Sequence, residues 1–184
     1  MGGPKALVPL LDGTFASVAL GRFERAEVGA RIVVVGAQAE RVTAEAGLPG
    51  GVVVVVNERW SEGMLTSVWA GLAAAEALET DAVLLHPVDN PLVAVATISA
   101  VLEALASGAK IAVPSHGGRR GHPAGFARAA WPALRAAALD GGARSLLAQH
   151  PEWVVHVPAG EDCLADIDTP AALEALRRRL AAGG

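Results

Sequence analysis

A carboxylate follows one of the apolar runs that have the pattern of a buried strand. Asp89 comes after the run from Ala82 to Leu85, in the sequence His-Pro-Val-Asp-Asn-Pro, and before a helical pattern. A carboxylate at the tip of a parallel strand is costly to desolvate unless it meets a cation, so Asp89 is a candidate ligand for Mg²⁺, which prefers oxygen. The alternative is that Asp89 caps a turn or the following helix, because Asp before Asn-Pro is common in turns.

Two more carboxylates, Asp166 and Asp168, lie close together near the end of the chain. Thr169 and Pro170 suit the N-cap and first position of a helix, so the helix dipole alone explains Asp168. Alternation along an extended segment places Asp166 and Asp168 on the same side. Either one is therefore a candidate to share a metal ion with Asp89, as in the Mg²⁺ sites of nucleotidyl transfer.

Two further segments carry groups suited to anions. The segment from Asn57 to Ser67 follows a β-branched run and opens a long helix, whose free amide groups favour contact with an anion or a base edge. Arg119 and Arg120 precede Gly121 on a glycine-bearing loop, where they either reach a phosphate or are solvated at the surface. His122 follows them and is a candidate hydrogen-bonding partner for a polar substrate group.

An alternation of strands and helices must position these segments. The apolar runs are Arg31 to Val35, Val52 to Val56, Ala82 to Leu85, Lys110 to Val113 and Trp153 to Val157, and the helical patterns are Thr14 to Ala26, Ala37 to Ala46, Met64 to Leu78, Val95 to Leu105, Ala129 to Leu139 and Pro170 to Leu180. This alternation predicts right-handed crossovers and an α/β fold with a mainly parallel sheet. Ligands bind such sheets at the carboxyl ends of the strands, so the polar segments are expected to meet there.

Composition narrows the class of protein. The 184 residues suffice for a single domain, 1–184, with a substantial core. A net charge of −4 provides no basic field for nucleic acid or an anionic membrane, so neither is an expected partner. The single cysteine, Cys163, fits a reducing compartment. No signal peptide or membrane-length apolar run is evident, which favours a soluble, cytoplasmic protein.

Taken in order, short motifs along nearly the whole chain resemble the molybdenum-cofactor cytidylyl- and guanylyltransferases and related sugar-phosphate nucleotidyltransferases. The motifs are Met1-Gly2-Gly3-Pro4-Lys5, Asp12-Gly13-Thr14, Asn57 with Glu62-Gly63-Met64 and Ser67, Asp89-Asn90-Pro91-Leu92-Val93, Gly121-His122-Pro123, Gly141-Gly142-Ala143-Arg144, and Asp166-Ile167-Asp168-Thr169-Pro170. The Gly-His-Pro and Asp-Ile-Asp-Thr-Pro segments are most similar to those of the cytidylyltransferases. The resemblance implies a three-layer sandwich with a Rossmann-like sheet of the GT-A, nucleotide-diphospho-sugar transferase type.

The resemblance also implies roles for individual residues. Lys5 neutralises the triphosphate, Asp89 holds Mg²⁺, and Asp166 or Asp168 completes the metal or substrate site. The residues implied in nucleotide or cofactor binding are Gly2, Gly3, Lys5, Asn57, Gly63, Ser67, Gly121 and His122. The implied reaction is attack by a terminal phosphate of molybdopterin on the α-phosphorus of CTP or GTP, with release of pyrophosphate. A molybdoenzyme or its maturation factor is a further implied partner.

In this family a first strand and a glycine-rich loop precede the segment that Met1 to Lys5 matches. We therefore expect a central ladder without its partner, a mobile Lys5, and weak CTP binding with little turnover until such a strand and loop are added. Two alternatives stay open: a catalytically silent relative that holds a nucleotide or pterin during molybdoenzyme maturation, and a nucleotidyltransferase for a phosphosugar or phospholactate. By resemblance alone, CTP is expected to be used better than GTP.

Overall fold

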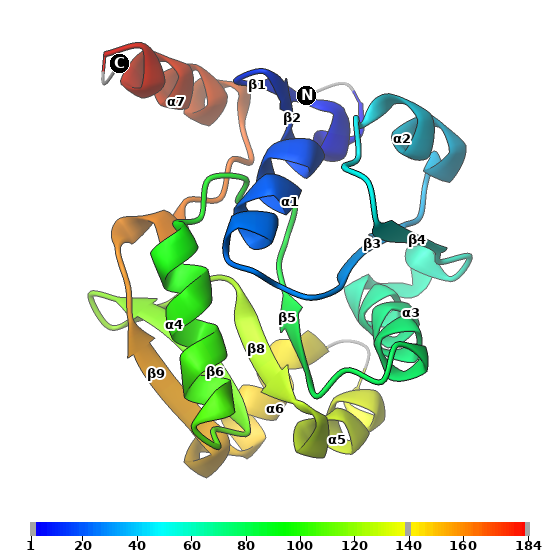
Figure 1. The fold of residues 1–184 in the computed structure, drawn as a ribbon, viewed down its shortest axis with the longest axis vertical. Helices are drawn as coiled ribbons and strands as arrows, with labels where there is room; N and C mark the ends of the chain where they lie inside the picture. The colour runs from blue at the N-terminus through cyan, green and yellow to red at the C-terminus, as the bar shows by residue number, and fades with distance from the viewer. Residues whose placement is uncertain (1–2, 139–140, 183–184) are drawn as a thin grey trace.

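Three of the apolar runs, at 82–85, 110–113 and 153–157, supply strands of a five-stranded sheet in the computed structural model, which describes residues 3–138 and 141–182 (Figure 1). The strands are β5 (Ala82–Leu85), β8 (Ala124–Ala127), β6 (Ile111–His116), β7 (Arg119–Arg120) and β9 (Val154–Pro158). β8 pairs antiparallel with both β5 and β6, and β9 pairs parallel with β6. The long strands β5, β6 and β9 therefore run in one direction, and β8 is inserted against them.

Two smaller sheets complete the strand set. β3 (Arg31–Val35) pairs with β4 (Val52–Val56) in a parallel ladder over the full length of both strands, and β1 (Pro9–Leu10) forms a hairpin with β2 (Gly13–Thr14). Within residues 3–138 and 141–182, no ladder joins β3 to β5.

Helices cover both faces of the large sheet, which confirms the α/β sandwich. They are α1 (Phe15–Arg25), α2 (Ala39–Glu45), α3 (Met64–Ala77), α4 (Val95–Ala106), α5 (Trp131–Ala136), α6 (Gly142–Gln149) and α7 (Pro170–Ala182), with 3-10 turns η1 (Lys5–Leu7), η2 (Trp60–Glu62), η3 (Arg128–Ala130), η4 (Pro151–Trp153) and η5 (Glu161–Leu164). Ile111 and Val113 of β6 pack with α3, α5 and α6, whereas Ala112 packs with α4. Alternate residues of one strand thus serve opposite layers.

The structure corrects several expected elements. β8 was not predicted, because Ala-Gly-Phe-Ala has few of the β-branched residues that mark strands. α6 was also missed, and the helix expected from Ala129 to Leu139 is shorter, with Leu139 outside the described residues. Of the glycine-bearing loop expected around Arg119 and Arg120, Gly117 and Gly118 form the turn of the β6–β7 hairpin, and the two arginines form β7. No helix in the described part of the chain has both the length and the apolar character to cross a membrane.

Candidate active site

Lys5 joins the two acidic segments. Its Nζ atom lies 2.9 Å from Oδ2 of Asp89 and also contacts Oδ1 of Asp168. The Asp89 side chain is 22% exposed and that of Asp168 is 61% exposed, so the group lies at the surface with Asp89 on its inner side. Two carboxylates from distant parts of the sequence therefore share one cation.

Lys5 itself belongs to an ordered turn. The Leu7 amide donates to the Pro4 carbonyl and the Val8 amide donates to the Lys5 carbonyl, each at 3.0 Å, which forms η1. α1 packs on this turn. The structure thus differs from the expectation of a mobile Lys5, because backbone hydrogen bonds and two carboxylates hold the residue in place.

A backbone contact brings the acidic segments together. The amide of Ile167 donates to the carbonyl of Asp89 at 2.8 Å, and Ile167 lies between Asp166 and Asp168. No group of three His, Cys, Asp or Glu side chains suited to a metal ion occurs among the described residues. Asp89 and Asp168 nevertheless form a pair around one cation, and Mg²⁺ needs only one or two protein carboxylates when waters and substrate phosphates supply its other ligands. The donor set fits this kind of site.

Neighbouring charges shift the pKa values of Lys5, Asp166 and Asp168. Hydrogen bonds from Lys5 to Asp168 and Asp89 raise the pKa of the Lys5 ammonium, and the hydrogen bond from Lys5 lowers the pKa of Asp168. Loss of hydration raises the pKa of Asp166; His122 opposes this shift, while Asp89 and Asp168 add to it. Asp168 therefore stays ionised to lower pH than an ordinary aspartate, and Asp166 accepts a proton more readily.

Gly121 and His122 pack directly against the segment that leads to Asp166. The Gly121 amide donates to Pro114 and the His122 amide donates to the Cys163 carbonyl, both at 2.8 Å. A Cβ atom at position 121 would lie 2.6 Å from Cys163 Sγ, which no real contact permits. Burial lowers the pKa of His122, while the nearby Asp166 carboxylate raises it. The lack of a side chain at Gly121 thus lets His122 approach the acidic segment.

Replacing Gly121 with alanine is expected to lower the free energy of unfolding by about 1–3 kcal/mol, because the added methyl group must displace the backbone around Cys163. Thermal or urea unfolding measures the change. Gly21→Ala is the matched control: Gly21 lies in α1 with no atom within 4 Å of the position that its methyl group would occupy, so its replacement is expected to stabilise the helix. Equal stability of the Gly121→Ala variant and the unaltered protein would contradict this packing.

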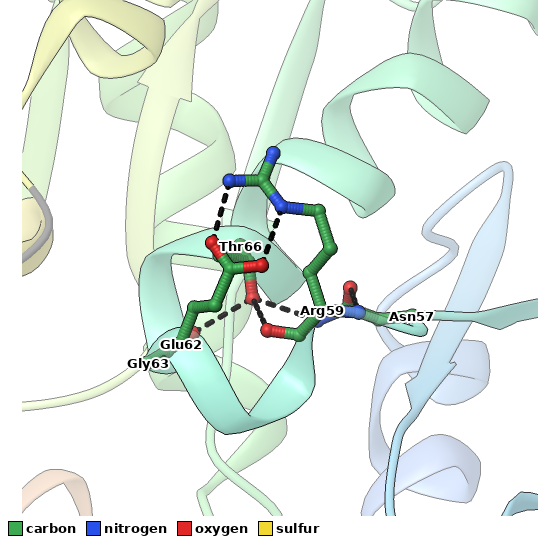
Figure 2. A network of polar contacts seen from close by, with 5 residues as sticks. All are labelled: Asn57, Arg59, Glu62, Gly63 and Thr66. Atoms are coloured by element: carbon green, nitrogen blue, oxygen red, sulfur yellow. Dashed lines mark hydrogen bonds and ion pairs between the residues drawn. The ribbon is translucent and has the colours of Figure 1, made fainter.

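A second polar cluster surrounds Asn57 at the end of β4 (Figure 2). The Asn57 side chain is 5% exposed, and its Nδ2 atom donates to Thr66 Oγ1 at 2.8 Å and to Ser67 Oγ at 2.9 Å. Its Oδ1 atom accepts from the Arg59 amide at 3.0 Å. The Thr66 hydroxyl lies 2.8 Å from the carbonyl of Gly63, whose φ of 124° favours glycine. Asn57 thus connects the end of β4 to the first turn of α3.

The Asn57 cluster and the Lys5 group lie against a shared part of the core. The Asn57 amide donates to Val35 at 2.8 Å, and Val35 packs in one apolar cluster with Val88, the neighbour of Asp89. No hydrogen bond or ion pair links the two groups among the described residues. Gly3 is exposed, and Gly2 lies outside the described residues. The structure therefore brings together Lys5, Asp89, Asp168 and the His122 loop, and holds Asn57, Gly63 and Ser67 in a separate network.

Sequence reasoning did not assign a role to His86, which precedes Asp89. Nε2 of His86 lies 2.7 Å from the Asn90 carbonyl, and its ring packs against Phe23 with the centroids 5.0 Å apart. Burial lowers the pKa of His86 to about 4. The imidazole is therefore neutral at pH 7, and its Nε2–H group donates to Asn90 across the turn that carries Asp89.

The lowered pKa of His86 predicts that the stability of the fold depends on pH. Between pH 6.5 and about 4 the unfolded chain binds a proton at His86 that the folded chain does not, so stability falls as pH falls through this window. The full contribution is about 3 kcal/mol. Urea unfolding at several pH values measures the slope, and NMR titration of the His86 ring assigns it. A His86 ring that titrates near pH 6.5 in the folded protein would contradict the prediction.

Known proteins resemble this chain in sequence and in fold. A curated relative, nicotine blue oxidoreductase from Paenarthrobacter nicotinovorans, is 33% identical over 91% of this chain and 84% of its own length. The solved structure of an Rv0371c homologue from Mycobacterium sp. strain JC1 is 24% identical and covers all of this chain and 91% of its own, with a TM-score of 0.86.

Two further solved structures share the fold. Rv0371c from Mycobacterium tuberculosis in complex with manganese is 24% identical, with a TM-score of 0.74 over 94% of this chain and 90% of its own. Molybdopterin-guanine dinucleotide biosynthesis protein A from Archaeoglobus fulgidus is 18% identical, with a TM-score of 0.71 over 98% of this chain and 92% of its own. The predicted GT-A type of fold is confirmed.

Fold and site together define an enzyme of the nucleotidyltransferase class. The family model that describes the MobA-like NTP transferase domain matches residues 1–154. The chain therefore belongs to the MobA-like NTP transferase family, which confirms the resemblance seen in its motifs.

Proposed function

We propose that the protein transfers CMP or GMP from CTP or GTP to molybdopterin in a Mg²⁺-dependent reaction. The observation that supports this most strongly is the contact of Lys5 with both Asp89 and Asp168. A cation binds between two carboxylates there, and the ammonium group is the one that the family resemblance assigns to the triphosphate. The same place thus suits both a divalent ion and the negative charge of a nucleotide.

In this proposal Asp89 and Asp168 hold Mg²⁺, and Lys5 binds the triphosphate. The Mg²⁺ ion offsets negative charge on the phosphates when it is bound. A terminal phosphate oxygen of molybdopterin forms a bond to the α-phosphorus while the bond to pyrophosphate breaks, so no covalent enzyme intermediate is needed. Lys5 donates to phosphate oxygens that gain charge during this step. His122 and Gly121 contact the substrate beside Asp166.

The acceptor and base assignments rest on similarity. One structural neighbour is a molybdopterin-guanine dinucleotide biosynthesis protein, and the Gly-His-Pro and Asp-Ile-Asp-Thr-Pro segments are most similar to those of cytidylyltransferases. We expect CTP to give faster pyrophosphate release than GTP with molybdopterin as acceptor. Equal rates of pyrophosphate release from CTP and GTP would show that the enzyme has no base preference. Pyrophosphate release only with a phosphosugar or phospholactate would show that this compound, and not molybdopterin, is the acceptor. Nucleotide binding without any turnover would identify a silent relative.

A second candidate function comes from the curated relative at 33% identity, which is named as an oxidoreductase of nicotine blue. In that case this chain reduces a dye of the same kind. Incubation with nicotine blue and NADH or NADPH, followed by loss of the dye's colour, tests it. Dye reduction that persists in the Asp89→Asn variant, without pyrophosphate release from CTP or GTP, would favour this function over transfer.

A further inference from the structure

The Asp162 side chain binds the start of a helix that lies in another part of the sequence. Its Oδ2 atom accepts from the Ala94 amide at 2.8 Å and from Thr97 Oγ1 at 3.1 Å, at the start of α4. Ala94, the N-cap of α4, has no side-chain oxygen with which to cap the helix. Asp162 instead binds the amide of the N-cap residue itself and the hydroxyl of Thr97 in the first turn, so its negative charge lies at the positive end of the helix dipole.

The backbone of Asp162 makes a contact on the other side of the same segment. Its carbonyl accepts from Nδ2 of Asn90 at 3.1 Å, and Asn90 is fully buried. Asp162 thus binds residues at both ends of the stretch from Asn90 to Ala94, which directly follows Asp89. One residue of η5 holds this stretch from two directions.

The segment after Asp162 contains the other two carboxylates. It meets the Asp89 turn through the Ile167 amide, which donates to the Asp89 carbonyl at 2.8 Å, and it meets the His122 loop through the Cys163 carbonyl. Within the described residues, two hydrogen bonds join the backbone of residues 160–168 to residues 89–97: the Ile167 amide donates to the Asp89 carbonyl, and Asn90 Nδ2 donates to the Asp162 carbonyl. The Asp162 side chain adds two more, from the Ala94 amide and the Thr97 hydroxyl. Loss of the Asp162 side chain would remove both bonds to α4 and leave two connections, the Ile167 bond and the bond from Asn90 to the carbonyl of residue 162.

We propose that Asp162 is a positioning residue of the active site: it fastens η5 to the start of α4 and thereby holds Asp166 and Asp168 beside Asp89. It acts through Asn90 and Ala94 and does not touch the substrate. The catalytic consequence rests on the proposed function, whereas the fastening itself does not. These contacts give a structural role to a carboxylate that the proposed reaction does not use.

Hydrogen–deuterium exchange tests the fastening without any need for activity. Asp162→Ala is expected to speed exchange at the Ile167 amide about 10-fold or more, because local opening of the segment becomes easier. Asp162→Asn is expected to have a smaller effect, since its amide oxygen can still accept from Ala94. Thr97→Val, which removes one of the two bonds to Oδ2, is expected to fall between the unaltered protein and Asp162→Ala.

Thr80→Ala is the matched control, because the Thr80 hydroxyl bonds to Ala75 at the end of α3, away from both acidic segments. It is expected to leave exchange at Ile167 unchanged. Mn²⁺ binding by the folded variants, measured by calorimetry in the presence of CTP, is expected to weaken about 10-fold in Asp162→Ala and not in Thr80→Ala.

Unchanged exchange at Ile167 in Asp162→Ala, or an equal rise in Thr80→Ala, would overturn the proposal. Faster exchange confined to residues 160–168 supports it. If exchange rises in this way but the unaltered protein binds no Mn²⁺, Asp162 still fastens the segment and the proposed function is what fails.

Discussion

The Asp89→Asn variant is expected to carry out Mg²⁺-dependent nucleotidyl transfer about 10²–10³ times more slowly than the unaltered protein. Asparagine keeps the size of the side chain but removes the negative charge that meets the cation beside Lys5. A neutral amide binds Mg²⁺ far less well than a carboxylate, so charge on the reacting phosphates is no longer offset. Initial rates of pyrophosphate release at several Mg²⁺ concentrations measure the effect.

The fold is expected to tolerate this change. The ion pair between Lys5 and Asp89 is partly exposed, and exposed pairs contribute about 0–1 kcal/mol. Asp81→Asn is the matched control, because Asp81 is exposed and precedes β5 at the end opposite to Asp89. Full activity in Asp89→Asn, or an equal loss in Asp81→Asn, would count against Asp89 as the metal-holding residue.

Replacing Lys5 with methionine is expected to have opposite effects on nucleotidyl transfer and on metal binding. Nucleotidyl transfer should fall about 10²-fold, because no positive side chain remains to bind the triphosphate there. Affinity for Mn²⁺ in the absence of nucleotide should rise, because the ammonium group no longer competes for Asp89 and Asp168. Calorimetry with Mn²⁺ alone and pyrophosphate release with Mg²⁺ and CTP measure the two quantities.

Lys110 is the other lysine of the sequence and provides the control. Its ammonium group lies over the ring of Trp153, 4.4 Å from the centroid, whereas Lys5 is the lysine that contacts the acidic segments. Lys110→Met should leave both nucleotidyl transfer and Mn²⁺ affinity unchanged. A fall in Mn²⁺ affinity in Lys5→Met would show that Lys5 organises the carboxylates and does not compete with the metal.

Much of the fold could be predicted because its strands are continuous apolar runs. The runs at 31–35, 52–56 and 82–85 are strands with the bounds expected from sequence. β8 could not be found in this way, because its four residues include no β-branched residue to mark a strand, and it is held by pairing with strands on both sides. Its antiparallel direction follows from tertiary pairing, which local sequence does not encode.

The site was predictable to the extent that it depends on strand ends. The position of Asp89 after β5 led to the expectation that it lies near the Asp166–Asp168 segment, and the structure places them together. The contact of Lys5 with both segments depends on the path of η1 and could not be derived from spacing. Asn57 shows the opposite limit: its bonds to Thr66, Ser67 and the Arg59 amide are contacts that the sequence did not indicate, and its role in nucleotide binding stays a prediction.

The most direct test of the central claim is transfer of label from [α-³²P]CTP or [α-³²P]GTP to molybdopterin with Mg²⁺. It should be run on the unaltered protein, on Asp89→Asn and on the Asp81→Asn control. We expect labelled dinucleotide and pyrophosphate in equal amounts from the unaltered protein and from Asp81→Asn, and almost none from Asp89→Asn. No label transfer by the unaltered protein, or transfer that does not depend on Asp89, would contradict the account.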